Sequence, residues 1–99
     1  MKVIVVGAGK VGFYLAKTLL QHGHTPLVIE TDQEHCRRAA DELGIPVTCG
    51  DGSSADVLQA AGAQGAAAIV TATGAAQTNL IACQTARRLF GVKRTLSRV

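Results

Sequence analysis

With 99 residues, 47% of them hydrophobic and 17% charged, the chain is too apolar for a disordered tail and long enough for a single domain, residues 1–99. No apolar stretch reaches the roughly 18 residues of a membrane-spanning helix, and the start lacks the long apolar region of a signal peptide, so we expect a cytoplasmic location. The net charge of +3 is uneven, because half of the ten Lys and Arg residues follow position 86. Aromatic residues that would stack bases do not alternate with these charges, so we assign them to the last helix and its end and expect no nucleic-acid partner.

Short apolar segments alternate with segments of helical length. Residues 3–6 are an uninterrupted apolar run, which is typical of a strand buried on both faces. In residues 10–22 apolar side chains recur every three or four positions, which predicts a helix that ends at Gly23. The other expected elements, in chain order, are a strand at 26–30, a helix capped by Thr31 or Asp32 that ends near Gly44, a strand at 45–49, a helix at 55–61 capped by Ser53 or Ser54, a strand at 66–71, a helix from 74–76 through Leu89, and a strand at 95–99.

Strands that alternate with helices predict βαβ units and a parallel sheet. We expect an α/β fold, a Rossmann-like doubly wound parallel sheet in three layers with five strands in the order 3-2-1-4-5. Aromatic residues are only 3% of the chain, so the core should be aliphatic and rich in alanine. In such folds a ligand binds at the carboxyl ends of the strands where the order reverses, here the first and fourth, and four loops should converge there.

The loop after the first strand carries a phosphate-binding fingerprint. Residues 7–12 (GAGKVG) match G-x-G-x-x-G between a strand and a helix. In this motif Gly7 allows the tight turn, Gly9 lets the backbone approach a diphosphate, and Gly12 lets the helix pack closely against the strand. The free N–H groups of the helix's first turn then point at the phosphates, and the helix dipole favours their charge. Lys10 either reaches a phosphate or is a solvated lysine.

An acidic residue at the end of the second strand accompanies this motif. Glu30 follows the apolar residues 27–29 about 20 positions after the glycines, where a carboxylate accepts hydrogen bonds from the ribose of adenosine. A carboxylate there repels a 2′-phosphate, so NAD is favoured over NADP. The alternative is a solvated acid at a strand end, which this spacing from the glycines disfavours.

Cysteine and histidine do not indicate a metal site. Cys36, Cys49 and Cys83 lack the spacing of metal ligands, and we interpret them as reduced, mostly buried small residues. His22 and His24 stand close together, but no third ligand accompanies them.

Nearly the whole chain resembles the N-terminal domains of the TrkA/KTN family (TrkA-N domains), also called RCK domains, which regulate potassium conductance. The matching stretches are VIVVGAGKVGFYLAKTL, VIETD, GDGSSADVLQAAG, AAAIVTATG, TNLIACQTARRLFGVKR and LSRV, in this order. The first is common to Rossmann domains. The GD loop with the leucine-and-glycine segment after it, and the TN that opens an alanine-rich helix ending in GVKR, are more distinctive.

The resemblance implies a cytoplasmic regulatory domain that binds NAD(H), or else ATP, ADP or AMP, and that gates a potassium uptake system by a ligand-induced conformational change. It implies a homo-oligomer, dimeric or larger, held at the inner face of the cell membrane by a channel or transporter subunit. The expected nucleotide-binding residues are Gly7, Ala8, Gly9, Lys10, Val11, Gly12, Glu30, Thr31, Asp51, Gly52, Thr71, Ala72 and Thr73.

Within this set, the resemblance places Asp51 beside the adenine and residues 71–73 along the far half of the ligand. Asp51 can instead stabilise its own turn, since Asp-Gly favours turns. Asn79 is interpreted as a polar residue within a helix that faces a neighbouring loop. Family members often carry acids after the fourth strand, where this chain has Gly74-Ala75-Ala76, so a role of those acids in cation binding or helix capping is not carried over. Family domains also continue beyond the fifth strand, so we expect 95–99 to present an apolar edge that pairs with another chain.

The predicted function is therefore a nucleotide-sensing regulator and not an enzyme. An NAD-dependent oxidoreductase fragment is the alternative, but such chemistry needs an acid–base residue against the substrate, and we expect none of the three histidines in the crevice. A third possibility is an interaction domain with a vestigial nucleotide site, against which the intact glycine motif and Glu30 argue.

Overall fold

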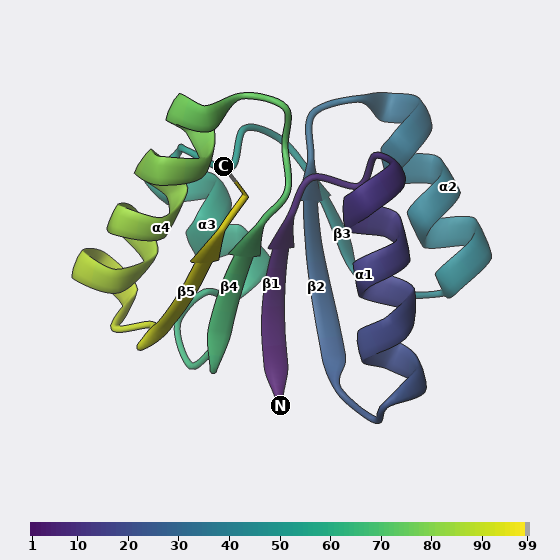
Figure 1. Cartoon of the computed structure of the whole chain (residues 1–99), viewed down its shortest axis with the longest axis horizontal. Coiled ribbons are helices and arrows are strands. Elements are labelled where there is room, and N and C mark those ends of the chain that lie inside the picture. Colours follow the sequence, from purple (N-terminus) through teal and green to yellow (C-terminus); the bar gives the residue numbers. More distant parts are fainter. Residues whose placement is uncertain (99) are drawn as a thin grey trace.

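Five strands form one parallel sheet in the order β3-β2-β1-β4-β5 within residues 1–98, the part of the chain that the computed structural model describes (Figure 1). This order confirms the predicted topology, and only Val99, the last residue of the predicted fifth strand, lies outside the described residues. The elements are β1 (Lys2–Val6), α1 (Lys10–Gln21), β2 (Thr25–Glu30), α2 (Gln33–Leu43), β3 (Val47–Cys49), α3 (Ala55–Ala61), β4 (Ala68–Thr71), α4 (Ala76–Phe90) and β5 (Arg94–Ser97).

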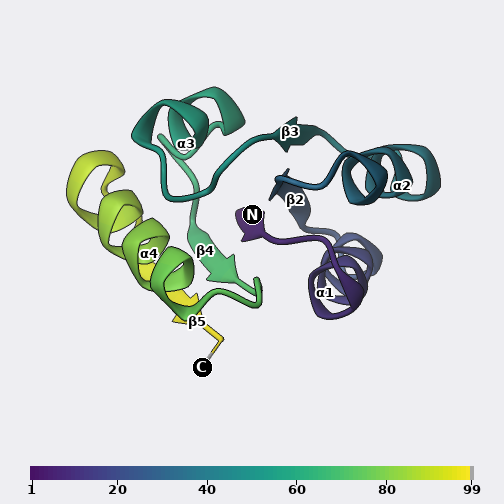
Figure 2. The same ribbon diagram turned by 90° about the horizontal axis from the view of Figure 1, so that it is seen from above.

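Helices cover both faces of the sheet, so the domain has three layers. Figure 2 shows α1 and α2 on one side and α3 and α4 on the other. Side chains of the central strand alternate between the two cores: Val3 and Val5 pack on the α1–α2 side, and Ile4 and Val6 on the α3–α4 side. Because both faces of β1 are buried, its sequence is continuously apolar.

The core is aliphatic and rich in alanine, as the composition predicts. Ala16 of α1, Ala39 of α2, and Ala82 and Ala86 of α4 are fully buried. A methyl side chain at these positions lets each helix approach the sheet closely, and the volume between the layers is filled by branched residues of the strands.

Local signals set most element boundaries. Asp32 caps α2 by accepting a hydrogen bond from the His35 N–H, and Ser54 caps α3 by accepting one from the Val57 N–H. β3 begins at Val47 and not at Ile45, because Pro46 has no N–H to donate to the ladder. The other differences from the predicted bounds are of one or two residues: β1 starts at Lys2, β2 at Thr25, β4 at Ala68 and β5 at Arg94, while α1 ends at Gln21, α4 at Phe90 and β5 at Ser97.

β5 lies at one edge of the sheet, and Leu96 in it is 68% exposed. Leu96 is the one large apolar side chain among Arg94–Ser97, so the edge is largely polar, and its pairing with another chain stays a prediction. The helices in residues 1–98 are all too short or too polar to cross a bilayer.

Candidate functional site

A cavity of about 600 Å³ opens at the carboxyl edge of the sheet, a size typical of small-molecule sites. The loops after β1, β2, β3 and β4 all reach it, together with the residue that follows β5. Its lining residues are Val6, Gly7, Gly9, Lys10, Val11, Ile29, Glu30, Thr31, Asp32, His35, Gly50, Asp51, Gly52, Ala72, Thr73, Gly74, Ala75, Thr78 and Arg98. The predicted convergence of four loops is thus observed.

The three motif glycines occupy distinct environments. Gly7 has a φ of +102°, which suits glycine, and its N–H donates to the Ile29 carbonyl at 2.7 Å. A Cβ at Gly12 would lie 1.8 Å from the Gly7 carbonyl oxygen, so α1 touches the turn directly. A Cβ at Gly9 would meet only His35 Cε1, at 3.9 Å, and Gly9 faces the cavity. These environments match the tight turn, the close packing and the open approach that the motif predicts.

The first turn of α1 has no side-chain cap. Gly9 is its N-cap residue and has no side chain, whereas Asp32 and Ser54 cap α2 and α3. The first N–H groups of any helix lack partners within the helix, and here they lie at the cavity. This helix terminus is therefore equipped to hold an anionic group.

Glu30 connects two of the loops around the cavity. Its Oε1 accepts a hydrogen bond from the Ala8 N–H at 2.6 Å, and its Oε2 accepts one from the Asp32 N–H at 2.9 Å. The Thr31 hydroxyl lies 3.4 Å from Oε2. Glu30 is thus no solvated acid: its carboxylate holds the glycine loop against the turn between β2 and α2.

His35 also lines the cavity, so the expectation that no histidine reaches the crevice was wrong. Its Nδ1 lies 3.7 Å from Glu30 Oε1. The histidine lies in the first turn of α2, three residues after the cap, and the helix begins at the carboxyl end of β2. The capping signal predicts where α2 begins, but the side of the helix that faces the glycine loop depends on its rotation against the sheet.

Asp51 adopts the turn that was its alternative interpretation and also lines the cavity. Its Oδ1 accepts hydrogen bonds from the Ser53 N–H at 2.9 Å and from the Ser53 hydroxyl at 2.8 Å. These bonds hold the pKa of Asp51 below its ordinary value, so the carboxylate is ionised at neutral pH. Gly52 next to it is buried, and a Cβ there would lie 2.4 Å from Val6 Cγ1.

The loop after β4 is held by Asn79, which is 1% exposed. Its Oδ1 accepts from the Thr73 N–H at 3.2 Å and from the Thr73 hydroxyl at 2.5 Å, and its Nδ2 donates to the carbonyls of Thr73 and Arg98. The interpretation that Asn79 faces a neighbouring loop is confirmed. The same residue also joins that loop to the end of β5.

Replacing Asn79 with alanine is expected to lower the free energy of unfolding by about 2–3 kcal/mol, because buried backbone groups of the loop lose their partners. Urea denaturation of the two proteins measures this change. Gln77→Ala, an exposed substitution in the same helix, is the matched control and should alter stability by less than about 0.5 kcal/mol. Equal stability of the Asn79 and Gln77 variants would contradict the bridging role.

Three predicted residues do not line the cavity. Thr71 is fully buried, with its hydroxyl 3.5 Å from the Leu96 carbonyl, because its side chain points into the α4 side of the sheet. Ala8 is buried and its N–H is bonded to Glu30, and Gly12 packs on Gly7. The prediction that Thr71 lines the ligand is therefore not supported. Ala8 and Gly12 instead fix the shape of the glycine loop on the side away from the cavity.

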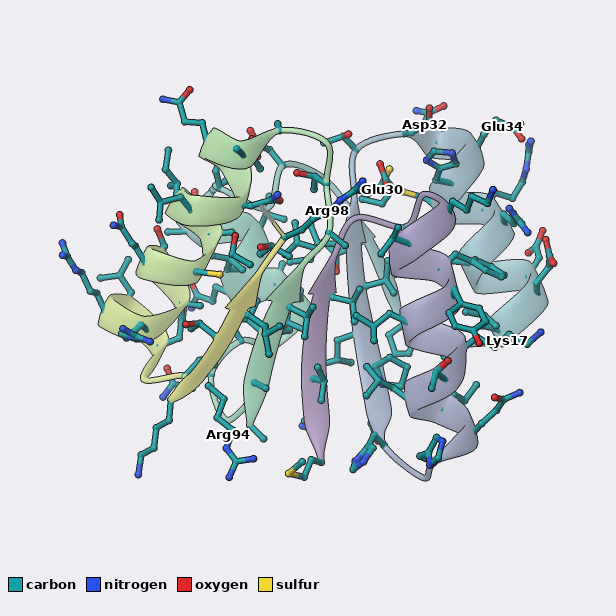
Figure 3. All side chains as sticks on the ribbon, viewed as in Figure 1. Lys17, Glu30, Asp32, Glu34, Arg94 and Arg98 are labelled. Atoms are coloured by element: carbon teal, nitrogen blue, oxygen red, sulfur yellow. The ribbon has the colours of Figure 1, made fainter. Side chains whose placement is uncertain are left out.

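Arg98 is a lining residue that the sequence analysis missed. Arg87 and Arg88 do occupy the last turn of α4, as expected, but Arg98 follows β5 at the carboxyl edge of the sheet. Figure 3 shows it on the same edge as Glu30 and Asp32. The rule that selects the carboxyl ends of strands applies to the fifth strand too, and it was the signal that could have identified this cation.

The family model of the TrkA-N domain matches residues 3–99. Trk system potassium uptake protein TrkA homolog 2 of Methanosarcina mazei is 42% identical over 90 residues, which cover 91% of this chain and 19% of that protein. Trk system potassium uptake protein TrkA of Vibrio alginolyticus is 35% identical over 99 residues, covering 100% of this chain and 22% of that protein. The chain spans less than half the length of these curated relatives.

Solved structures share the fold at lower identity. The Kef CTD of Shewanella denitrificans in AMP-bound form matches with a TM-score of 0.86 and 23% identity, over 100% of this chain and 59% of that one. The GsuK channel bound to NAD matches with a TM-score of 0.80 and 19% identity, over 99% and 18%. ChuY of Escherichia coli O157:H7, described as an anaerobillin reductase, matches with 0.77 and 22%, over 98% and 50%.

Proposed function

This chain belongs to the TrkA-N domain family, and on that premise we propose that it is a cytoplasmic regulatory domain that binds NAD(H) or an adenine nucleotide and thereby gates a potassium transport system. The observation that carries this proposal is the pairing, in one cavity, of an uncapped helix terminus with a carboxylate one strand away. The first suits a diphosphate and the second suits the ribose attached to it.

The lining residues support one placement of the ligand. A diphosphate lies over Gly9 and the first turn of α1, with Lys10 in reach of its charge. Although both Glu30 oxygens already accept backbone N–H groups, a carboxylate has about four lone-pair sites, so it can also accept a ribose hydroxyl. The adenine lies toward Asp51, and the far half of a dinucleotide lies toward Thr73 and Arg98.

Regulation follows from the number of loops that share the cavity. A bound nucleotide contacts the loops after four strands and so favours the arrangement in which all four are in place. The nucleotide binds the two arrangements of these loops with different free energies, and this difference is the free energy available to shift a gate between its states. Relatives named as potassium uptake proteins and the GsuK channel support a membrane transport partner. The homo-oligomer is part of the same proposal.

An NAD-dependent oxidoreductase fragment is the second candidate, favoured by the fold shared with ChuY and by His35 in the cavity. We propose that the chain is not an enzyme, because His35 lies against Glu30 on the side expected for the adenosine and not beside the far half of a dinucleotide, where hydride transfer occurs. Oxidation of NADH in the presence of carbonyl substrates distinguishes the two, and turnover would favour the enzyme.

Titration calorimetry with NAD, NADH, ATP, ADP and AMP tests the proposal, and at least one of them should bind. Gly9→Val should then weaken binding about tenfold or more, equivalent to about 1.4 kcal/mol, because its side chain fills the approach to the diphosphate. Gly9 has a φ of −69° and open space at its Cβ position, so the variant should keep its fold. Ala40→Val, which adds similar bulk at an exposed site on α2, should bind normally. Absence of binding by all five nucleotides would overturn the proposal.

A further inference from the structure

Two cysteines lie directly behind the cavity wall. Cys36, near the start of α2, and Cys49, the last residue of β3, have their Sγ atoms 2.7 Å apart. Both are free thiols; Cys36 is buried, while Cys49 is exposed. The expectation of reduced, mostly buried cysteines is met, since Cys36 and Cys83 are buried and Cys49 is the exposed one. A disulfide has a sulfur–sulfur separation of about 2.05 Å, so closing the bond requires a movement of less than about 1 Å.

The pair contacts Glu30, the residue that connects the loops. The Cys36 thiol donates to the Glu30 carbonyl at 3.2 Å, and Cys49 is the ladder partner of Glu30 in the sheet. The next residue, Gly50, lines the cavity and donates its N–H to the same carbonyl at 2.8 Å. A bond between the two sulfurs would therefore tie the start of α2 to the end of β3, next to the turn after β2 and the loop after β3, which are the two walls expected to hold the adenosine.

We propose that Cys36 and Cys49 form a reversible disulfide on exposure to a peroxide, and that this disulfide tightens nucleotide binding. The second part of the proposal rests on the function proposed above. The physical reason is that the crosslink restricts two loops which the ligand otherwise has to order, so less conformational entropy is lost on binding. Disulfides in reducing compartments are commonly of this transient, sensing kind.

The exposed thiol reacts first. Burial, together with the neighbouring Cys49 sulfur, raises the pKa of Cys36 to about 12, so Cys36 keeps its proton. Cys49 is exposed and is therefore the sulfur that a peroxide reaches from solvent. The Cys49 thiolate attacks hydrogen peroxide, breaks its O–O bond and becomes a sulfenic acid, with release of hydroxide. The Cys36 sulfur then displaces the sulfenic hydroxyl and loses its own proton, which yields the disulfide. In total two thiols are oxidised by two electrons and one peroxide is reduced to two waters.

The test treats the full chain with hydrogen peroxide, removes the excess, and measures intact mass, the crosslinked peptide and the affinity for AMP and NAD. The expected results are loss of two hydrogen atoms, a peptide joining Cys36 to Cys49, and about fivefold or greater tightening that dithiothreitol reverses. By reciprocity, the bound nucleotide should raise the oxidised fraction of the pair in a glutathione buffer by the same factor. Cys49→Ser should abolish these effects, whereas Cys83→Ser, a buried thiol on the α4 side of the sheet, should preserve them.

Failure to form the Cys36–Cys49 disulfide overturns the proposal, and so does a disulfide that leaves affinity unchanged or weakened. Absence of nucleotide binding in both redox states instead contradicts the proposed function. The two failures are distinguishable because mass and peptide mapping detect the disulfide without any ligand.

Discussion

Replacement of Gly12 by alanine is expected to lower the free energy of unfolding by about 3 kcal/mol or more, at or beyond the upper end of ordinary overpacking. The added Cβ would lie 1.8 Å from the Gly7 oxygen and 2.6 Å from the Gly7 carbonyl carbon. Both are backbone atoms. Gly7 has little room to move, because its N–H is hydrogen-bonded to the Ile29 carbonyl and a Cβ built on Gly7 would lie only 3.1 Å from the carbonyl carbon of Ala72. The first turn of α1 would have to separate from β1. Urea denaturation at neutral pH measures the effect.

The matched control is the same methyl group placed at Gly9. There the nearest atom is His35 Cε1 at 3.9 Å and φ is −69°, so Gly9→Ala should retain wild-type stability within about 0.5 kcal/mol. Comparison of the two variants therefore distinguishes Gly12, which the fold requires, from Gly9, which leaves room for a ligand. Equal stability of the two variants would contradict the close contact between α1 and the turn.

The fold was predictable because its signals are local and mutually consistent. Continuous apolar runs mark strands that are buried on both faces, and the helices between them impose a parallel sheet. The caps at Asp32 and Ser54 follow from side-chain chemistry that acts over three residues. The separate roles of Gly7 and Gly12 were likewise expected, since a tight turn followed by a closely packed helix leaves no space for a Cβ.

The site was predictable only in part, because its remaining residues depend on packing between distant segments. Thr71 was placed along the ligand, but strand alternation directs its side chain toward α4. Arg98 and His35 reach the cavity from the end of β5 and the start of α2, and their positions relative to the glycine loop depend on strand order and helix rotation together. The contact between Cys36 and Cys49 requires the β2–β3 register, which no pattern within either segment specifies.

Replacement of Glu30 by glutamine is the second substitution with a large expected effect. The carboxylate uses one oxygen for the Ala8 N–H and the other for the Asp32 N–H. Glutamine has a single side-chain acceptor oxygen, so one of these N–H groups must face the amide NH₂ and lose its partner. We expect a loss of about 1–3 kcal/mol in the free energy of unfolding from this change. Thermal and urea unfolding without ligand measure it.

The affinity for nucleotide should fall by more than a lower folding stability would cause, because Glu30 also positions the glycine loop and is the expected acceptor for a ribose hydroxyl. We expect a loss of about tenfold or more, or at least about 1.4 kcal/mol of binding free energy. Glu34→Gln removes the same charge from an exposed position in the first turn of α2, where the side chain is 76% exposed, and it is the matched control. If the two variants bind alike, the proposed role of Glu30 in binding the ribose is contradicted. If only Glu30→Gln binds weakly, the Glu30 carboxylate both assembles the site and binds the ribose. The site then depends on this side chain more strongly than the fold does.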